Sequence, residues 1–545
     1  MRSLERELLA QLAATPLLDR VELAAISGRS TSAVYAGVEA LEREGLVVWT
    51  LHATEQVRST RRVHLTADGL DHMARESGTN TAALLSDHPA SEQWLRALLR
   101  RLDAVAVIYR LASALCEAAF PIRVRWYRSA PADAAIALPD GRTLAIVRWG
   151  RSVERTAFAR RVRRLREGAE YSAALLLAPD EVRLRHARRL AASLPFPCFL
   201  TLENSVAAAS AETPIWQVPS GGSRISLTTA LRFVRRRGSW TREAARQRRT
   251  PPRSLSLGDG ADDWRLPSQL KPAQKRTLDL IADWPWIAPH HLEGLLGVQR
   301  RRVSGLIQQL SQPRLITSPK LAGQRRLVLT DRALAMIAQR DRASPAAARE
   351  RWSASPLDRD AALDWRNVSG TRSRQLLRHM DHTEAVHEFV AQLATQARAK
   401  HLQLRQLDPP QRASRYFRHQ GRLHSIQPDA YGLLLGGARQ PFFLEWERRA
   451  IRPRTMAARL APYLRYFQGR RPLDDHGAQP RLVIVFEQDL LASRFLRVAR
   501  DEFERAGVDV PLFVSDRERL QADGPLGSIW LSAEGWDRQR AFSSG

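Results

Sequence analysis

The chain has 545 residues and a mass of 61.5 kDa, too large for one hydrophobic core, so about three to five domains are expected. Hydrophobic residues make up 44% of the sequence, which excludes a largely disordered protein. The formal net charge of +28 favours a polyanionic partner, because Arg and Lys contacts to phosphates release counterions, and nucleic acid is the expected one.

The cysteines and the hydropathy pattern indicate where in the cell the protein is expected and which metal or disulfide sites are not expected. Cys116 and Cys198 lie in apolar runs without Cys/His spacing, so neither a zinc site nor a disulfide framework is expected. Charges interrupt the N-terminal amphipathic pattern, unlike a signal peptide, and no apolar run reaches the roughly 18 residues that a membrane span needs. We therefore expect a cytoplasmic, nucleoid-associated protein that has no membrane partner.

The first predicted elements are helices and a hairpin, and their pattern returns in the second half of the chain. Residues 4–72 contain a helix over Leu4–Ala14, the segment VELAAISG, the helix RSTSAVYAGVEALEREGLV and a stretch ending in RRVHLTADGL. Residues 273–337 repeat this order with HHLEGLLG, VQRRRVSGLIQQLSQPRLI and RRLVLTDRAL. A repeat at this length indicates that one structural unit occurs twice.

Both repeats have the pattern of a winged helix-turn-helix. Gly28 and Gly297 suit the left-handed conformation that ends a helix. The next helix has apolar residues on one face only, which leaves its other face free for a major groove, and a hairpin or wing follows. DNA contacts are expected from Arg29, Ser32, Tyr35, Arg58, Arg61 and Arg62 in the first repeat, and from Gln299, Arg300, Arg301, Ser304, Lys320, Arg325 and Arg326 in the second.

A second kind of domain follows each repeat. A predicted β-hairpin precedes helix, strand, helix and strand, and both copies end in Ile-Trp, at Trp216 and Trp530. This alternation predicts an α/β domain with a mixed sheet. The expected map is a winged helix at 1–75, an α/β domain at 95–218, a linker at 219–268, a winged helix at 270–340, a connector at 342–378 and an α/β domain at 380–535.

The sharpest chemical pattern is Pro428-Asp429 followed by Glu445-Trp446-Glu447. On a hairpin, Asp429 begins one strand and Glu445 lies on its partner, with Glu447 on the same face because strand side chains alternate. Carboxylates on adjacent strands make a hard oxygen site that suits Mg²⁺, with Asp429 and Glu445 as metal ligands. The sequence therefore predicts Asp429, Glu445 and Glu447 as candidate catalytic residues.

The order and spacing of these acids resemble the PD-(D/E)XK nuclease superfamily over 380–535, with Glu447 at the position of the lysine. In the first half Asp133 is retained, while Arg148 and Gly150 are expected at the positions of the two glutamates, so that copy is expected to bind no metal. Together with the two winged-helix repeats, this resemblance implies a fold class of α+β or α/β multidomain. Each winged helix would be followed by a restriction-endonuclease-like α/β domain, the first of them degenerate.

Two interpretations of the acidic residues stay open. One is a Mg²⁺-dependent endonuclease directed by the winged helices. The other is a pseudonuclease whose acids pair with local arginines such as Arg448 or Arg459, and Glu447 at the lysine position favours it slightly. Mg²⁺ is the expected cofactor only if the site is active; otherwise none is expected.

A wider pattern is similar to the plasmid replication-relaxation protein family. It comprises Pro428-Asp429-Ala430, the acid pair followed by Arg448, and Leu464-Arg465-Tyr466-Phe467 on a helix. The resemblance covers 270–535, and the first half looks like a diverged duplicate. It implies a DNA-binding accessory protein of a mobile genetic element, acting in replication, relaxation or transfer, with double-stranded DNA and relaxase or other mobile-element proteins as partners. A transcriptional regulator is a further alternative.

Overall fold

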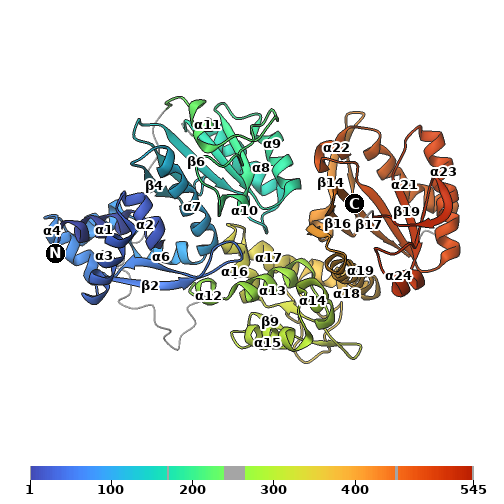
Figure 1. Ribbon diagram of the computed structural model, residues 1–545. Coiled ribbons are helices and arrows are strands. Elements are labelled where there is room, and N and C mark those ends of the chain that lie inside the picture. Colours follow the sequence, from blue (N-terminus) through green and yellow to red (C-terminus); the bar gives the residue numbers. More distant parts are fainter. Residues whose placement is uncertain (1, 169–170, 238–263, 449–451, 543–545) are drawn as a thin grey trace. The chain divides into compact units, whose positions relative to one another are not determined.

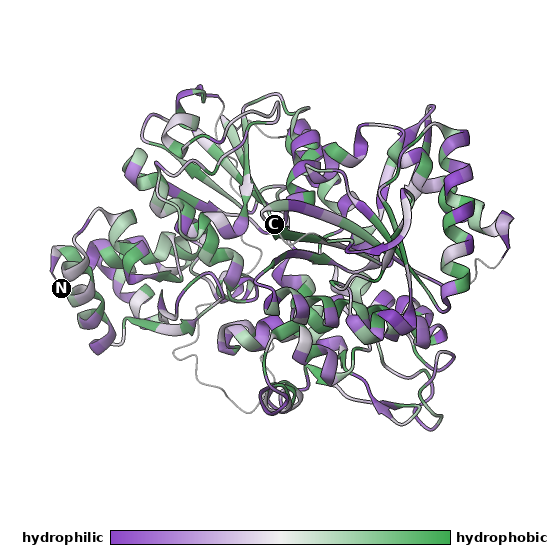
Figure 2. Cartoon of the chain, turned by 45° about the vertical axis from the view of Figure 1, so that its right-hand side comes forward, coloured by the Kyte–Doolittle hydropathy of each residue, from purple (hydrophilic) through white to green (hydrophobic). Residues whose placement is uncertain are grey.

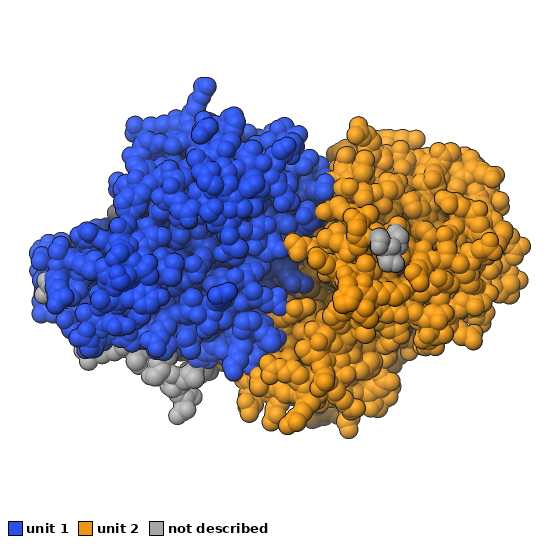
Figure 3. Space-filling view, viewed as in Figure 1, with its two compact units in different colours: residues 1–275, 335–348 blue, residues 276–334, 349–545 orange. Residues whose placement is uncertain are grey.

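The computed structural model describes residues 2–168, 171–237, 264–448 and 452–542. They form two compact units, which Figure 3 colours separately: unit 1 is Met1–Lys275 with Ala335–Ala348, and unit 2 is Arg276–Leu334 with Arg349–Gly545. Each unit contains helices and a mixed sheet, which confirms the predicted mixture of α and β structure. Within these ranges no helix combines the length and the apolar character needed to cross a membrane.

Unit 1 begins with three helices and a hairpin (Figure 1). Gly28, with φ of 67°, ends α2 (Arg20–Ser27), and the Ser30 side chain caps the start of α3 (Thr31–Arg43). Val34, Val38 and Leu41 bury one face of α3 in the core. The remaining elements of this part are α1 (Ser3–Ala14), β1 (Leu18–Asp19), β2 (Val47–His52) and β3 (Thr60–Leu65), with β3 antiparallel to both β1 and β2.

Around the start of unit 2 the same order of elements appears. Gly297, with φ of 69°, ends α14 (Pro289–Leu296), and α15 (Arg300–Ser311) follows with Val303, Ile307 and Leu310 buried. Two antiparallel pairs of short strands come next. The elements are α13 (Pro272–Asp283), β9 (Ile316–Thr317), β10 (Lys320–Leu321), β11 (Gln324–Arg325), β12 (Val328–Leu329) and α16 (Asp331–Arg340).

One apolar core joins the opening helices of unit 1 to its sheet. The helix α7 (Leu102–Ala118) is mostly apolar, and most of its residues are buried. Its Tyr109 hydroxyl donates to the Pro16 carbonyl at 2.7 Å and accepts from the Trp126 indole at 3.0 Å. The regions 1–75 and 95–218 therefore share a core. The helices between them are α4 (Ala67–Glu76), α5 (Thr81–Asp87) and α6 (Glu92–Leu99).

The two large sheets have the same strand order and directions. In unit 1 the order is β4-β5-β6-β7-β8, and in unit 2 it is β13-β16-β17-β18-β19 followed by β20 and β21. In each, the first three strands are antiparallel and the third to fifth are parallel. Figure 2 shows apolar residues on the central strands and polar residues on the outer helices. The strands are apolar because helices cover both faces of a parallel sheet.

The bounds of the strands and their helices are as follows. In unit 1 they are β4 (Arg123–Trp126), β5 (Ala134–Ala137), β6 (Thr143–Arg148), α8 (Arg155–Gly168), β7 (Ala173–Ala178), α9 (Glu181–Ala191), β8 (Cys198–Leu202) and α10 (Glu203–Val206). In unit 2 they are α19 (Met380–Ala399), β13 (Gln403–Asp408), α20 (Pro410–Ala413), β14 (Arg415–His419), β15 (Arg422–Ile426), β16 (Ala430–Gly436), β17 (Ala438–Glu447), α21 (Pro453–Phe467), α22 (Arg471–His476), β18 (Arg481–Phe486), α23 (Asp489–Ala506), β19 (Leu512–Asp516), α24 (Arg517–Asp523), β20 (Trp530–Ser532) and β21 (Gly535–Gln539).

Both stretches expected as connections contribute to folded parts. Residues 238–263 of the linker expected at 219–268 lie outside the described residues, but α11 (Leu227–Arg232) packs into the core of unit 1, and α12 (Leu266–Gln269) follows. The connector expected at 342–378 contains α17 (Pro345–Trp352) and α18 (Thr371–Arg378). Its Val368 is fully buried in a cluster with Trp286. A few apolar side chains within a polar composition are enough to anchor both stretches.

Candidate functional site

The start of α15 presents a basic, exposed face. Gln299 precedes the first turn, and Arg300, Arg301 and Ser304 are exposed, while Val303 is buried on the opposite side. In the described part of the chain neither arginine forms an ion pair or a hydrogen bond through its side chain. Their charges are therefore available to a partner molecule.

The corresponding face of α3 is partly engaged within the chain. Arg29 forms an ion pair with Glu7 of α1, with 2.6 Å between Nη2 and the carboxylate. Ser32 is exposed and lies 3.3 Å from the Ser30 hydroxyl. Tyr35 is 39% exposed, and the Arg20 guanidinium stacks 4.6 Å from its ring centre. A partner at this face would meet one arginine whose charge is already compensated.

The structure corrects the placement of two hairpin arginines that were expected at DNA phosphates. Arg62 is fully buried, and Arg326 is 3% exposed. Each follows an arginine that does face solvent. For Arg61 and Arg62 on β3, the reason is that neighbouring side chains on a strand point to opposite faces. The hairpin cations that do lie at the surface are Arg58, Arg61, Lys320 and Arg325.

Arg62 holds the opening part of unit 1 together. Its Nη1 donates to Glu22 on α2 at 2.8 Å and to the Leu17 carbonyl at 2.9 Å, and its Nε donates to His52 Nδ1 at 3.2 Å. Burial alone would lower the pKa of Arg62, but the Glu22 carboxylate raises it, so the guanidinium stays charged. This arginine is structural.

Arg326 has a similar role in unit 2. It donates to Glu384 on α19 and, at 2.6 Å, to Gln324. Two acids of α19 have partners away from the Asp429 site. Glu384 binds Arg326, and Glu388 contacts His290 and His291 at the start of α14.

The three acids of the predicted metal site lie at the same edge of the sheet of unit 2. Asp429 immediately precedes β16, and its backbone nitrogen donates to the Leu444 carbonyl of β17 at 2.9 Å. Glu445 and Glu447 lie near the end of β17 and are 2% and 6% exposed. Nevertheless, among the described residues these three carboxylates do not all offer oxygens within 4.8 Å of one another.

An arginine occupies the space between the two glutamates. Arg459 of α21 approaches Glu445 at 2.7 Å through Nη2 and Glu447 at 2.9 Å through Nε. The Tyr463 hydroxyl, one turn further along α21, donates to Glu445 at 2.5 Å. The carboxylate oxygens that a cation would need are thus already bound by Arg459 and Tyr463.

Asp429 is held by two other groups. One of its oxygens accepts from the Trp446 backbone nitrogen at 2.8 Å, and the other lies 2.9 Å from His382 Nε2 of α19. Burial alone would lower the pKa of His382, but its bond to Asp429 raises it. Burial, and then the neighbouring Asp429 charge, raise the pKa of Glu445 to about 8.

The equivalent place in unit 1 has another register than the sequence spacing indicated. Asp133 N donates to the Ile146 carbonyl, and the Arg148 backbone nitrogen donates to the Asp133 carboxylate, as Trp446 does to Asp429. Val147 and Trp149 therefore stand at the positions of Glu445 and Glu447. The assignment of Arg148 and Gly150 to these positions was wrong by one residue, because the first hairpin is shorter.

Arginines surround Asp133. Arg161 donates to it at 2.8 Å, and Arg161 follows Trp149 by the same number of residues as Arg459 follows Glu447. Arg342 donates to its other oxygen at 3.0 Å. Burial alone would raise the pKa of Asp133, but these cations hold it well below its usual range. Arg148 itself pairs with Glu203 and Asp341.

Sequence reasoning missed the side chains that face the acids from neighbouring helices. Tyr463 lies one turn after Arg459 on an amphipathic helix, so its placement follows once Arg459 is known to face the sheet. His382 comes from a helix remote in sequence, and no spacing rule connects it to Asp429.

Comparison with known proteins gives one match. Residues 290–482 match the model of a family described as replication-relaxation. The matched segment contains α15, the three acids and α21, and it supports the family resemblance predicted from the sequence. No curated protein and no solved structure matches the chain.

Proposed function

We propose that the chain is a DNA-binding accessory protein of a mobile genetic element, acting in replication, relaxation or transfer of its DNA. The observation that carries this proposal is the exposed start of α15, where Arg300 and Arg301 have no ion pair among the described residues. The match to the replication-relaxation family supplies the biological setting. Double-stranded DNA is the proposed ligand, and relaxase or other mobile-element proteins are the proposed partners.

We infer that both repeats are winged helices. Each has a helix that ends at a left-handed glycine, a following helix with one buried and one exposed face, and antiparallel strands after it. In a winged helix the second helix enters the major groove, and the hairpin reaches the backbone. Because Arg29 of the first repeat is paired with Glu7, α15 is the principal DNA-reading helix.

Replacing Arg300 and Arg301 with alanine should weaken binding to duplex DNA and lower the slope of log K against log salt by about one to two. If one of them contacts a guanine, part of the loss, about 1–3 kcal/mol, should be confined to one base pair. Fluorescence anisotropy at several salt concentrations, with a selected duplex and a random competitor, measures both effects.

The matched control removes the same charge from α23. Arg494 and Arg497 are exposed on that helix, so Arg494→Ala with Arg497→Ala should leave the salt slope near that of the unchanged protein. Equal slopes for the α15 and α23 variants would refute α15 as the DNA-binding helix and leave only a general charge effect.

We further propose that the two sheet domains are diverged copies of one restriction-endonuclease-like fold. They share strand order and direction, an aspartate before the second of these strands, and an arginine at the same place in the following helix. The unit 1 copy, with Val147 and Trp149 in place of the glutamates, is a scaffold. The unit 2 copy keeps the acids but has Arg459 between them.

From this arrangement we infer that the unit 2 site is a pseudonuclease. Saturating Mg²⁺ should leave the melting temperature of the full chain unchanged, and supercoiled DNA should stay uncut, because a cation would have to displace Arg459 from both glutamates. Arg459→Ala frees the acids, and in that variant alone Mg²⁺ should raise the melting temperature by mass action.

The opposite result would establish the alternative, a Mg²⁺-dependent endonuclease. Its signature is a metal-dependent melting shift and DNA nicking in the unchanged protein, both lost in Asp429→Ala and in Glu445→Ala. Water activation by the ion would then supply the chemistry.

A further inference from the structure

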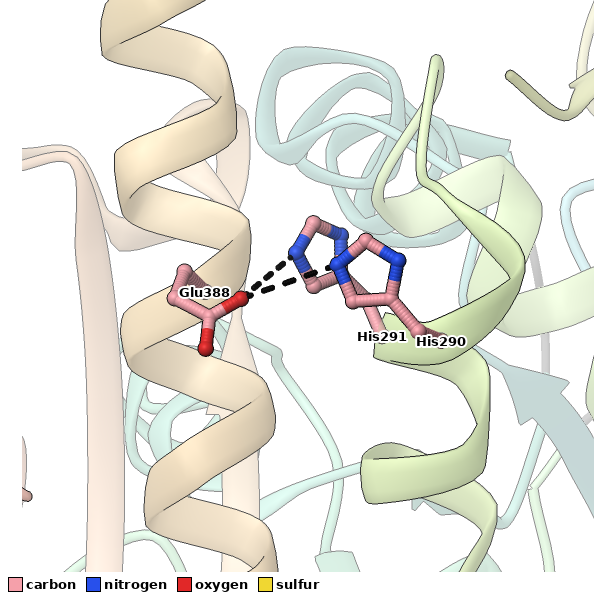
Figure 4. Close-up of side chains that lie close together, drawn as sticks. All are labelled: His290, His291 and Glu388. Atoms are coloured by element: carbon pink, nitrogen blue, oxygen red, sulfur yellow. Dashed lines mark hydrogen bonds and ion pairs between the residues drawn. The ribbon is translucent and has the colours of Figure 1, made fainter. Parts of the chain in front are cut away.

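His290, His291 and Glu388 converge from two helices of unit 2, as Figure 4 shows. The histidines lie in the first turn of α14, and Glu388 lies on α19. One oxygen of Glu388 is 2.9 Å from His291 Nε2 and 3.7 Å from His290 Nε2. Among the described residues this is the one group of three His, Cys, Asp or Glu side chains whose ligand atoms all lie within 4.8 Å of one another.

The distances suit a tetrahedral ion. Zinc bonds to nitrogen and carboxylate oxygen are about 2.0–2.2 Å long, so ligand atoms around it are about 3.3 Å apart. The two measured separations lie on either side of this value, and a shift of a few tenths of an ångström satisfies both. Imidazole nitrogens with a carboxylate are a donor set that favours a transition metal such as zinc over Mg²⁺.

The frame that holds the three ligands is rigid. A Cβ at Gly294 would lie 2.9 Å from the Ala391 carbonyl oxygen, so α14 and α19 pack closer than any other residue would allow. The second oxygen of Glu388 accepts from the Gln392 amide at 2.8 Å, which turns the first oxygen toward the histidines. His291 is 1% exposed, so its ring is fixed by packing.

One side of the cluster is open to solvent. The side chains of His290 and Glu388 are 58% and 38% exposed. A metal ion can enter from that side, and a water molecule can complete the four ligands.

We propose that His290, His291 and Glu388 bind one divalent transition-metal ion of the zinc class. The ion cross-links α14, which packs against the DNA-reading helix α15, to α19, the helix that supplies His382 to the acidic site. This metal site is separate from the Asp429 site, and its existence does not depend on DNA binding.

The test uses the full chain, stripped with a chelator and titrated with Zn²⁺, and with Co²⁺ as a coloured probe. We expect one high-affinity equivalent, a higher melting temperature with Zn²⁺, and the visible absorption of four-coordinate Co²⁺. His290→Gln and Glu388→Gln change partly exposed side chains, so the fold should survive, which circular dichroism checks. Each should weaken Zn²⁺ binding by roughly 100-fold or more, since losing even an outer-shell partner costs about 10–100-fold.

Glu293→Gln is the matched control, because it makes the same kind of change on α14 outside the cluster. It should bind Zn²⁺ as the unchanged protein does. If the unchanged protein binds no Zn²⁺ equivalent, or if His290→Gln and Glu388→Gln bind as tightly as Glu293→Gln, the proposal fails and the cluster is a hydrogen-bonded contact between helices. DNA binding is measured separately on each variant, so a failure of the DNA-binding proposal cannot be mistaken for this one.

Discussion

Replacing Arg62 with alanine is expected to lower the free energy of unfolding of unit 1 by about 3–5 kcal/mol. The guanidinium and the Glu22 carboxylate are both fully buried, so removing the cation leaves an uncompensated charge in the core. The same change also removes the bonds to the Leu17 carbonyl and to His52. Urea unfolding, with hydrogen exchange to locate the loss in unit 1, measures the effect.

The neighbouring Arg61 provides the control. It is exposed and stacks 4.2 Å from the ring centre of Trp49, so Arg61→Ala should cost no more than about 1 kcal/mol. Glu22→Gln keeps the hydrogen-bond acceptor that caps α2 but removes the charge. Because Glu22 and Arg62 share one interaction, the double variant should lose less stability than the sum of the two single variants. An Arg62→Ala protein that is stable but binds DNA poorly would return this residue to the DNA-contacting surface.

Local rules in the sequence predicted much of the fold. Left-handed glycines at Gly28 and Gly297 and apolar positions such as Val34 and Val303 located the helices of both repeats. Asp429 and Glu445 were expected on neighbouring strands; Glu445 lies on β17, and Asp429 immediately precedes the neighbouring strand β16. These features depend on residues close together in the chain or on one hairpin.

The features that were wrong or missed depend on which face of a strand a residue occupies or on contacts between residues remote in sequence. A pair of adjacent arginines on a strand cannot have both side chains at the surface of a one-sided sheet, so Arg62 could have been assigned to the interior from alternation alone. The register of Arg148 depends on the length of a loop, which spacing within a motif does not reveal. Glu388 and His291 are remote in sequence, so no spacing within a motif connects them.

The second large effect concerns pH and the acidic site. Burial and the Asp429 charge raise the pKa of Glu445 from 4.5 to about 8. Between these values the folded chain keeps this proton and the unfolded chain releases it, so the unfolded state binds fewer protons. Stability therefore falls as pH rises through this window, by about 1.4 kcal/mol per pH unit at most from this group. Glu445→Gln, which is neutral at every pH, should remove that slope.

The groups around Glu445 allow a sharper test. Asp429 and Glu447 oppose its ionisation, whereas Arg459 and the Tyr463 hydroxyl favour it; His382 also faces it across Asp429. Asp429→Asn removes a neighbouring charge, so it should lower the pKa of Glu445 and end the loss of stability at a lower pH. Glu518→Gln, at an exposed position of α24, should leave the slope unchanged. The measurement is urea unfolding from about pH 5 to about pH 8, with hydrogen exchange at β17 as the local readout.

If Glu445→Gln unfolds with the same pH slope as the unchanged protein, Arg459 keeps the carboxylate ionised. If Glu445→Gln instead loses the slope, Glu445 of the unchanged protein is protonated at neutral pH. A protonated carboxyl is a poor ligand for Mg²⁺, because a metal ligand must be deprotonated, so this outcome would support the pseudonuclease.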